Sequence, residues 1–396
     1  MHNGRRVIGA EHVEAARRRG RLTMEVLPGD ILTPLAEETA VRVGLALVDG
    51  PLERPAVVRT GGATALRRGL YRRSPKWVTP VVSRTSREAR RLGKIALIGA
   101  GGVGSALALL VSQSGAAHQI ALIDIMPGLA EAMALDLNHA SGISHTQTNV
   151  VGRADLELVD GADVVVVTAG RPRTPGMTRA DLIDVNRRVI HSAAEAIKTR
   201  APTSIVIVVT NPLDEMTAEM LQATGFPRER VIGMAGTLDS SRFRHALAKA
   251  ADVTSADVEA ICLGAHGDEM VPITSRARIK GRPLEVFLSD EAIDAAAKDA
   301  VTGGGQVVSL RKTGSATHAP AHATMELIDH LRAARTGPVP ASVMLSGEYG
   351  IDGTVLGVPC RLGPRGVIEV EELTLSDSEH DALRAAAKAI RARVAR

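Results

Sequence analysis

The stretch Lys94-Ile95-Ala96-Leu97-Ile98-Gly99-Ala100-Gly101-Gly102-Val103-Gly104 decides the fold of this chain. Its apolar part has the length of a buried parallel strand, and the glycines that follow fit the pattern G-x-G-x-x-G. A helical run then extends from Ser105 to Ser114, and a second apolar run, Gln119 to Ile123, ends at Asp124. This order predicts the first unit of an α/β fold with a doubly wound parallel sheet, a Rossmann fold.

Each part of the glycine loop has a mechanical purpose in binding a dinucleotide. Gly99 permits a tight turn, Gly101 lets the backbone approach a pyrophosphate, and Gly104 lets helix and strand pack closely. The helix N-terminus attracts the phosphates, and Asp124 can bind the adenosine ribose while it repels a 2′-phosphate. We therefore expect NAD rather than NADP, with contacts from Gly99, Ala100, Gly101, Gly102, Val103, Gly104 and Asp124. The alternative is a glycine-rich loop in another strand–helix–strand unit, with Asp124 as a strand-end cap.

The composition is that of a globular protein. The chain has 396 residues, of which 45% are apolar and 23% charged, enough for two or three domains. It has no apolar run as long as a membrane span and no secretory signal at its start. Cys262 and Cys360, the only cysteines, agree with a reducing compartment. We therefore expect a cytoplasmic protein without a membrane partner.

Positive charge is concentrated at the front of the chain. Residues 1–93 carry 18 Lys and Arg against 9 Asp and Glu, a net charge of +9. Because the whole chain has a net charge of +4, the remainder is +4 − 9 = −5. We therefore expect no nucleic-acid partner for the main body.

Residues 1–50 are expected to form a small unit of their own. The pattern predicts helices over Ala10 to Arg19 and Pro34 to Gly44, and strands over Leu22 to Val26 and Leu45 to Val48. The segments that carry a resemblance are Val7-Ile8-Gly9-Ala10-Glu11-His12-Val13-Glu14-Ala15-Ala16 and Thr33-Pro34-Leu35-Ala36-Glu37-Glu38-Thr39-Ala40. They resemble an N-terminal segment of bacterial microcompartment proteins, such as those of ethanolamine utilisation. The resemblance implies association with a microcompartment.

Residues 51–93 are expected to form a basic linker. They contain eleven Arg and Lys but only two acids, Glu53 and Glu88. The segment from Leu66 to Trp77 mixes arginines with Leu70, Tyr71 and Trp77. The simplest interpretation is a solvated linker, the second is a docking peptide for a shell or partner protein, and the third is a nucleic-acid patch.

From Lys94 onward, strands and helices alternate regularly. This predicts a dinucleotide-binding domain over residues 94–236 and an α+β catalytic domain over residues 237–396. Buried strands are predicted at Ala162 to Thr168, Ser204 to Val209 and Val231 to Gly233. Because ligands of such sheets lie beyond the carboxyl ends of the strands, the polar residues just after these strands are candidates for the site.

Six further motifs follow the glycine loop. They are Leu135-Asp136-Leu137-Asn138-His139, Thr168-Ala169-Gly170-Arg171-Pro172-Arg173-Thr174-Pro175-Gly176-Met177-Thr178-Arg179, Val209-Thr210-Asn211-Pro212, Leu238-Asp239-Ser240-Ser241-Arg242-Phe243-Arg244, Gly264-Ala265-His266-Gly267-Asp268 and Gly347-Glu348-Tyr349-Gly350. In this order they resemble the lactate and malate dehydrogenase family, most closely the malate dehydrogenases that are built like lactate dehydrogenase. The resemblance implies an NAD-dependent oxidoreductase that acts on a 2-hydroxy acid.

The resemblance assigns the acid–base chemistry to His266 and Asp239. The base must titrate near neutrality, which suits a histidine. Asp239 would accept the other imidazole N–H, hold the tautomer and stabilise the imidazolium that forms. Without the matching motifs, His266 would more commonly be an ordinary loop histidine.

Three further side chains are assigned to the substrate. Arg242 would bind its C1 carboxylate through paired guanidinium donors, although an arginine three residues after Asp239 is commonly a helix-face ion pair. Asn211 would hydrogen-bond the substrate oxygen, and a turn-forming Asn before proline is the alternative. Arg179 would polarise the C2 oxygen from a loop that closes over the site.

Arg173, on the same loop, occupies the position that separates the activities of the family. A neutral Gln there suits a methyl group, whereas Arg pairs with a second carboxylate. A buried arginine that faces a methyl group is costly. The resemblance therefore implies a small dicarboxylate substrate, (S)-malate or oxaloacetate, and a reaction of the tricarboxylic acid cycle.

The resemblance also places Asn186 and the backbone of Val209, Thr210 and Asn211 beside the cofactor. One departure is Thr317-His318, where relatives often carry aromatic residues near the substrate pocket. His318 and His322 have the spacing of a metal pair, but hydride transfer to a carbonyl polarised by arginine needs no metal. We therefore expect none.

The helix that contains Leu135 to His139 forms subunit contacts in relatives, which implies a homo-oligomer, dimer or tetramer, with two-fold symmetry. Near the C-terminus, Ser376 and Glu379 predict a capping box before a helix with an apolar stripe. Two alternatives to a malate enzyme stay open. One is a lactate or other 2-hydroxyacid dehydrogenase, and the other is a scaffold or binding protein that retains the fold.

Overall fold

The structure is a computed structural model that describes residues 7–18, 23–26, 30–49, 89–171, 179–312 and 314–394. The chain divides into two compact units, Met1–Arg73 and Ser74–Arg396. The basic segment 51–88 and the loop 172–178 lie outside the described residues. Among the described helices, none is both long and apolar enough to cross a membrane.

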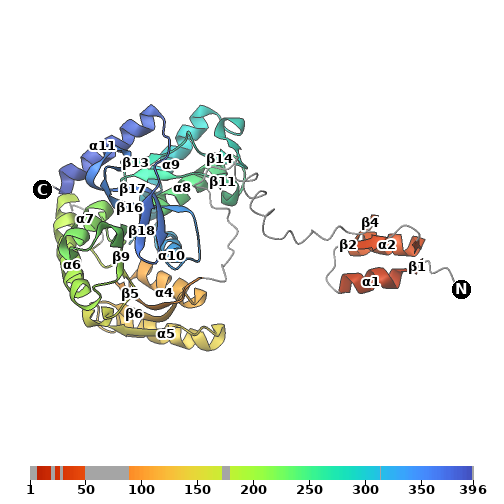
Figure 1. Ribbon diagram of the computed structural model, residues 1–396, viewed down its shortest axis with the longest axis horizontal. Coiled ribbons are helices and arrows are strands. Elements are labelled where there is room, and N and C mark those ends of the chain that lie inside the picture. The colour runs from red at the N-terminus through yellow and green to blue at the C-terminus, as the bar shows by residue number, and fades with distance from the viewer. Residues whose placement is uncertain are drawn as a thin grey trace. The chain divides into compact units, whose positions relative to one another are not determined.

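The first unit is a small α/β arrangement. Its elements are β1 (Val7–Ile8), α1 (Ala10–Arg18), β2 (Thr23–Val26), β3 (Ile31–Leu32), α2 (Pro34–Val43) and β4 (Ala46–Asp49). The strands form two parallel pairs, β1 with β3 and β2 with β4, and α1 and α2 lie side by side (Figure 1). The two helices and two of the strands were predicted. The other two strands have only two residues each, too few for a periodicity to be visible.

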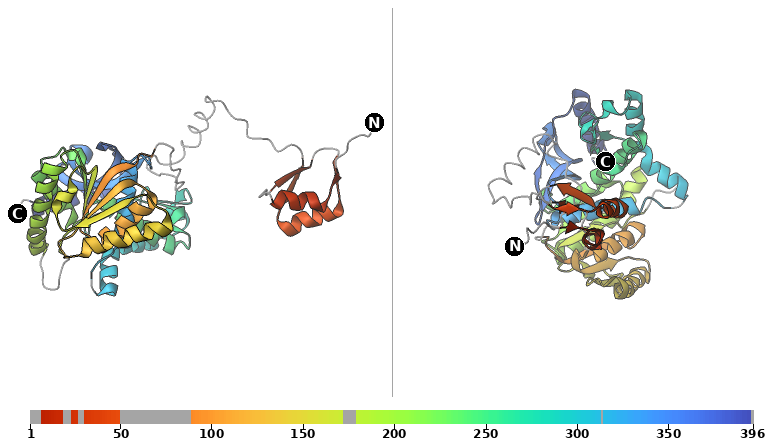
Figure 2. Two further views of the ribbon diagram at one scale, coloured as in Figure 1. Left: turned by 90° about the horizontal axis from the view of Figure 1, so that it is seen from below. Right: turned by 90° about the vertical axis from the view of Figure 1, so that its right-hand side faces the viewer.

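The first half of the second unit is the predicted doubly wound sheet. Its elements are β5 (Leu92–Ile98), α4 (Gly102–Ser114), β6 (Ala117–Ile123), α5 (Leu129–Ser144), β7 (Asn149–Arg153), β8 (Val164–Val167), α6 (Arg179–Arg200), β9 (Ile205–Val208), α7 (Leu213–Thr224) and β10 (Val231–Gly233). The strands run parallel in the order β7-β6-β5-β8-β9-β10. The left view of Figure 2 shows them in one twisted sheet. The α/β fold class is confirmed.

Both faces of this sheet are buried, because successive residues of a strand point to opposite sides. In β5, Ile95 and Leu97 belong to a core formed with α4 and α5, whereas Ala96 and Ile98 belong to a core formed with α6 and α7. The continuous apolar runs of the central strands follow from this double cover. The strand β5 begins at Leu92, inside the predicted linker.

The second half adds α8 (Gly236–Ala250), β11 (Val258–Glu259), β12 (Cys262–Gly264), β13 (Met270–Pro272), β14 (Arg278–Ile279), β15 (Arg282–Pro283), α9 (Asp290–Arg311), α10 (His318–Leu331), β16 (Pro338–Ser346), β17 (Asp352–Gly363), β18 (Gly366–Val370) and α11 (Asp377–Val394). Strand β16 pairs antiparallel with β10 through Gly233 and Ser342. A single 11-stranded sheet therefore runs through both halves. A Cβ on Gly233 would lie 2.9 Å from the Ser342 Cβ, so a glycine is needed at this junction.

The predicted capping box at the start of α11 is present. Ser376 donates its backbone N–H to Glu379, and Glu379 donates its own to the Ser376 hydroxyl. The stripe Leu383, Ala387 and Ile390 is buried. This helix packs against β17 and α7. Helix α7 carries one of the residues of the site described below.

Candidate active site

The glycine loop lies at the topological switch point of the sheet, where β5 neighbours both β6 and β8. A Cβ on Gly99, whose φ is +109°, would lie 2.5 Å from the Thr168 Oγ1, and a Cβ on Gly104 would collide with the Gly99 carbonyl oxygen. A Cβ on Gly101 would meet no described residue within 4 Å, so this part of the structure leaves the space above it open. The first turn of α4 begins there without a side-chain cap. An open glycine at a free helix N-terminus fits a pyrophosphate.

Asp124 follows β6 at the edge of this loop. Its carboxylate accepts the backbone N–H of Ala100 at 2.7 Å and that of Met126 at 2.9 Å. The strand-end cap, which was the alternative interpretation, is therefore formed. Asp124 is still partly exposed, so its contact with a ribose stays a prediction.

Asn186, on α6, ties together the loops that follow β8 and β9. It is 1% exposed, its Oδ1 accepts the Arg171 N–H at 2.7 Å, and its Nδ2 donates to the Asn211 carbonyl at 2.6 Å. Thr210 adds a second tie by donating its hydroxyl to the Ala169 carbonyl at 2.6 Å. The Asn186 amide is thus used to position backbone, while Asn211 is exposed at the sheet edge.

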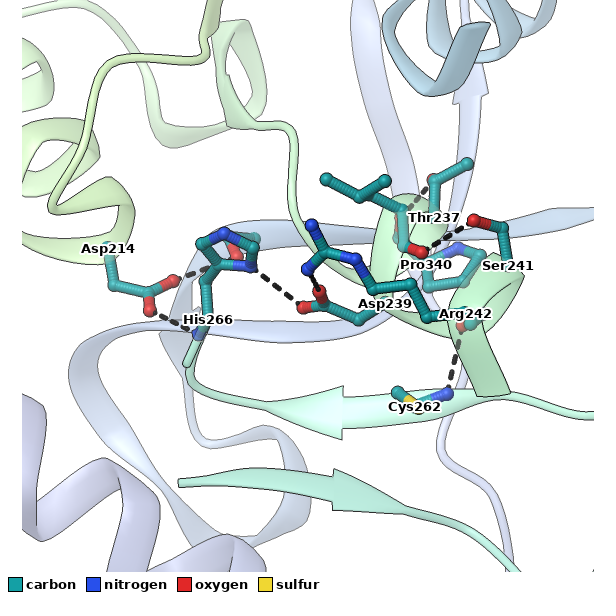
Figure 3. Close-up of polar contacts among 11 residues, drawn as sticks. Asp214, Thr237, Asp239, Ser241, Arg242, Cys262, His266 and Pro340 are labelled. Carbon is teal, nitrogen blue, oxygen red and sulfur yellow. Dashed lines mark hydrogen bonds and ion pairs between the residues drawn. The ribbon is translucent and has the colours of Figure 1, made fainter. Parts of the chain in front are cut away.

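His266 and Asp239 form a buried pair (Figure 3). The His266 Nδ1 lies 2.9 Å from the Asp239 Oδ2, and their side chains are 17% and 3% exposed. A carboxylate can only accept, so Nδ1 carries the proton. His266 lies in the turn between β12 and β13, where Gly264 and Gly267 have positive φ.

Asp239 serves two partners at once. Its other oxygen, Oδ1, accepts from Arg242 Nη1 at 3.3 Å, one helical turn along α8. The first turn of α8 is held against β16, because Thr237 donates its hydroxyl to the Pro340 carbonyl at 2.6 Å. The helix-face ion pair expected from the sequence spacing is therefore formed, and it orients the guanidinium.

The environment shifts the pKa of His266 upward. Burial of the ring lowers its pKa, but the charge and hydrogen bond of Asp239 outweigh this effect. The charge of Asp214 raises the pKa further, and Arg242 opposes it. The imidazolium is therefore favoured beyond an ordinary histidine.

Asp214 is a neighbour of His266 that the motif analysis did not single out. Its carboxylate accepts the backbone N–H of His266 at 2.8 Å and the Ser342 hydroxyl at 2.9 Å. The residue is completely buried at the start of α7. The sequence signal that could have indicated Asp214 is an acid two residues after Asn211-Pro212, at the start of a helix that also carries the apolar Met216.

The side chains of two predicted site residues lie outside the described part of the chain. Arg173 belongs to the loop outside the described residues, and Arg179 begins α6 with a side chain that is likewise not described. Thr317, where the sequence departs from its relatives, packs close to the glycine loop: a Cβ on Gly102 would lie 2.5 Å from the Thr317 methyl group. His318 and His322 are exposed on α10. No group of three His, Cys, Asp or Glu suited to a metal exists among the residues that the structure describes.

Comparison with protein families settles the ancestry of this arrangement. Residues 93–233 match the NAD binding domain of lactate/malate dehydrogenase, and residues 236–396 match its alpha/beta C-terminal domain. The chain belongs to the lactate/malate dehydrogenase family.

Relatives within the family agree with this result. A malate dehydrogenase from Trichormus variabilis is 42% identical over 306 residues, which cover 77% of this chain and 94% of the relative. The crystal structure of Cryptosporidium parvum malate dehydrogenase superposes with a TM-score of 0.74 at 37% identity, over 77% of this chain and 98% of that one. A lactate dehydrogenase from the same organism, complexed with lactic acid and NAD, gives a TM-score of 0.74 at 35% identity, with the same coverage.

Membership of the family makes NAD the cofactor of this chain. The open space at Gly101 and the uncapped first turn of α4 fit its pyrophosphate. The sequence prediction of NAD is confirmed.

Two glycines in the middle of α9, Gly303 and Gly304, leave room for the Arg242 side chain. A Cβ on Gly304 would lie 3.3 Å from the Arg242 Nη2, and one on Gly303 would lie 3.6 Å from its Cδ. Glycine in a helix interior costs about 1 kcal/mol relative to alanine. The guanidinium therefore occupies a position that a side chain at residue 304 would crowd.

Alanine at Gly304 should disturb Arg242 while it strengthens the helix. The family resemblance assigns this guanidinium to a substrate carboxylate, so we expect KM for oxaloacetate to rise about fivefold, with a smaller change in kcat. Gly305→Ala is the matched control, because a Cβ there meets none of the described residues within 4 Å. Steady-state kinetics of both variants provide the measurement. Equal KM values for Gly304→Ala and Gly305→Ala would contradict this role of the glycine.

Proposed function

We propose that this chain is an NAD-dependent malate dehydrogenase that catalyses (S)-malate + NAD⁺ ⇌ oxaloacetate + NADH + H⁺. The observation that carries the proposal is the bond between His266 and Asp239 at 2.9 Å, in a chain 42% identical to a malate dehydrogenase. The same site contains Arg242, which is bonded to that aspartate. A guanidinium group is suited to bind a substrate carboxylate.

In the oxidation direction, His266 takes the proton of the malate hydroxyl. Its Nδ1–H is directed to Asp239, so Nε2 is the nitrogen that accepts. Bound NAD supplies the chemistry of accepting the hydride from C2. Asp239 then stabilises the imidazolium with a charge that is already in position, so little reorganisation is needed. In reduction, the protonated His266 returns the proton to the C2 oxygen.

The substrate carboxylates are assigned to arginines. Arg242 would bind the C1 carboxylate with two guanidinium donors, a geometry that lysine cannot reproduce. Asn211, exposed at the carboxyl end of β9, would hydrogen-bond the C2 oxygen. Arg179 would polarise that oxygen and Arg173 would pair with the second carboxylate, from positions whose side chains lie outside the described part of the chain.

A substrate panel tests this function directly. We expect kcat/KM for oxaloacetate to exceed that for pyruvate by at least about 100-fold with NADH, and NADPH to be a poor cofactor. Arg173→Gln should shift the ratio toward pyruvate, since the charge that meets the second carboxylate is removed. An unchanged ratio would show that Arg173 has another role.

Two other functions give different results in the same assay. A higher kcat/KM for pyruvate would identify a lactate dehydrogenase, an activity supported by the lactate dehydrogenase among the similar structures. Absence of NADH oxidation with every 2-oxo acid would identify a scaffold that has kept the fold.

We also propose that the larger unit is a complete enzyme and that residues 1–93 serve location or assembly. About 77% of this chain covers 94% to 98% of the relatives, which supports the first part. A small N-terminal unit, a basic linker and two domains divided near residue 236 remain our proposed organisation.

Exposed Leu135 and Ile143 on α5 support a homo-oligomer, dimer or tetramer. Light scattering that gave only the 41.5 kDa chain would refute it.

Deletion of residues 1–88 should leave kcat and KM nearly unchanged. The cut precedes Arg90, whose backbone N–H donates to the Arg332 carbonyl at 2.8 Å and which is therefore part of the larger unit. Location is expected to change, from association with a microcompartment to the general cytoplasm. Fluorescent fusions of both forms, with kinetics of the purified proteins, provide the measurement. A truncated protein that fails to fold or to turn over would show that the extension belongs to the enzyme.

A further inference from the structure

His266 contacts two buried carboxylates, and the mechanism above uses only one. Asp239 binds the ring at Nδ1, while Asp214 accepts the backbone N–H of the same residue at 2.8 Å. Figure 3 shows the two acids on opposite sides of His266. Asp239 comes from α8 and Asp214 from α7, so the histidine is held from two separate elements.

Hydrogen bonds hold both oxygens of the Asp214 carboxylate. Its Oδ1 accepts the Ser342 hydroxyl at 2.9 Å, and its Oδ2 accepts the His266 N–H. The residue is completely buried. Because a buried ionised carboxylate is costly without a compensating partner, its presence here needs an explanation beyond packing.

We propose that Asp214 is a positioning residue for the acid–base step, which fixes the main chain of His266 and stabilises its imidazolium through space. This inference rests on the proposed function, in which His266 exchanges a proton with the substrate. Asp239 then determines the tautomer of the His266 ring, and Asp214 fixes the position of the His266 backbone. Both charges favour the protonated ring.

The charges around the pair agree with this role. Burial raises the pKa of Asp214 to about 6, and the hydrogen bond and charge of His266 act to lower it. When Asp214 is ionised, its charge raises the pKa of His266. The two groups are coupled, since a protonated His266 favours the ionised form of Asp214 and an ionised Asp214 favours the protonated form of His266.

The remaining charged groups lie on neighbouring elements. Arg242 on α8 lowers the pKa of His266, opposite to the two acids. Glu215, next to Asp214 on α7, raises the pKa of Asp214, but it is paired with Arg393 of α11 at 2.6 Å. Arg393 also pairs with Glu269, in the turn that follows His266. Of the charged groups near Asp214 that the structure describes, His266 lowers its pKa and Glu215 raises it.

Asp214→Asn tests the proposal, because it removes the charge and keeps an oxygen that can accept the His266 N–H. Without that charge the imidazolium is less stable, so the pKa of His266 falls. Oxidation needs the neutral ring and reduction needs the protonated ring. The rising limb of kcat/KM for malate and the falling limb of kcat/KM for oxaloacetate should therefore both move to lower pH, by about half a unit.

Glu219→Gln is the matched control. Glu219 lies on the same helix and is also a nearly buried acid, but it binds Arg187 at 2.7 Å and His191 at 3.0 Å. Its loss should leave both limbs in place. Ser342→Ala is a gentler second variant, which removes one hydrogen bond from the Asp214 carboxylate and should move both limbs in the same direction by less.

A readout without cofactor or substrate separates this inference from the proposed function. An NMR titration of the His266 ring, assigned by its absence in His266→Gln, should show the lower pKa in Asp214→Asn even if the wild type proves inactive on malate. Limbs and ring titration that do not move in either Asp214→Asn or Ser342→Ala would overturn the proposal, whatever happens to kcat. A shift to higher pH would overturn it as well.

Discussion

One buried carboxylate, that of Asp239, is the interaction on which the rest of the site depends. Its two oxygens bind different partners, the imidazole of His266 at 2.9 Å and the guanidinium of Arg242 at 3.3 Å. A single negative charge thus orients both the proton carrier and the group assigned to the substrate carboxylate. Because the side chain is only 3% exposed, water screens this charge poorly.

The fold brings these groups together at one edge of a continuous sheet. Helix α8 begins directly after β10, the hairpin with His266 follows β12, and α7 with Asp214 follows β9. The pairing of Gly233 with Ser342 joins the parallel and antiparallel strands, and Ser342 also donates to Asp214. The junction that unites the two halves therefore also supports the acid–base pair. The glycine loop at the switch point supplies the cofactor site beside it.

Much of the parallel half could be predicted from local patterns, because strands buried on both faces read as apolar runs and the glycine loop has a strict spacing. The His266–Asp239 contact could not, since 27 residues separate the partners and no periodicity links them. It was predicted from family resemblance alone. Asp214 was missed for the same reason, as its partner lies 52 residues away. The pairing of β10 with β16, which continues the sheet into the second half, consists of one residue pair. A single pair leaves no repeating pattern in the sequence from which it could be predicted.

The most direct test of this account is the rate of oxaloacetate reduction by Asp239→Asn with NADH at saturating substrate. Asparagine keeps the shape of the side chain but not the charge that balances the imidazolium and orients Arg242. The account predicts that kcat falls by at least about 100-fold. A kcat within about threefold of the wild type would contradict it, because proton transfer would then not depend on the buried carboxylate.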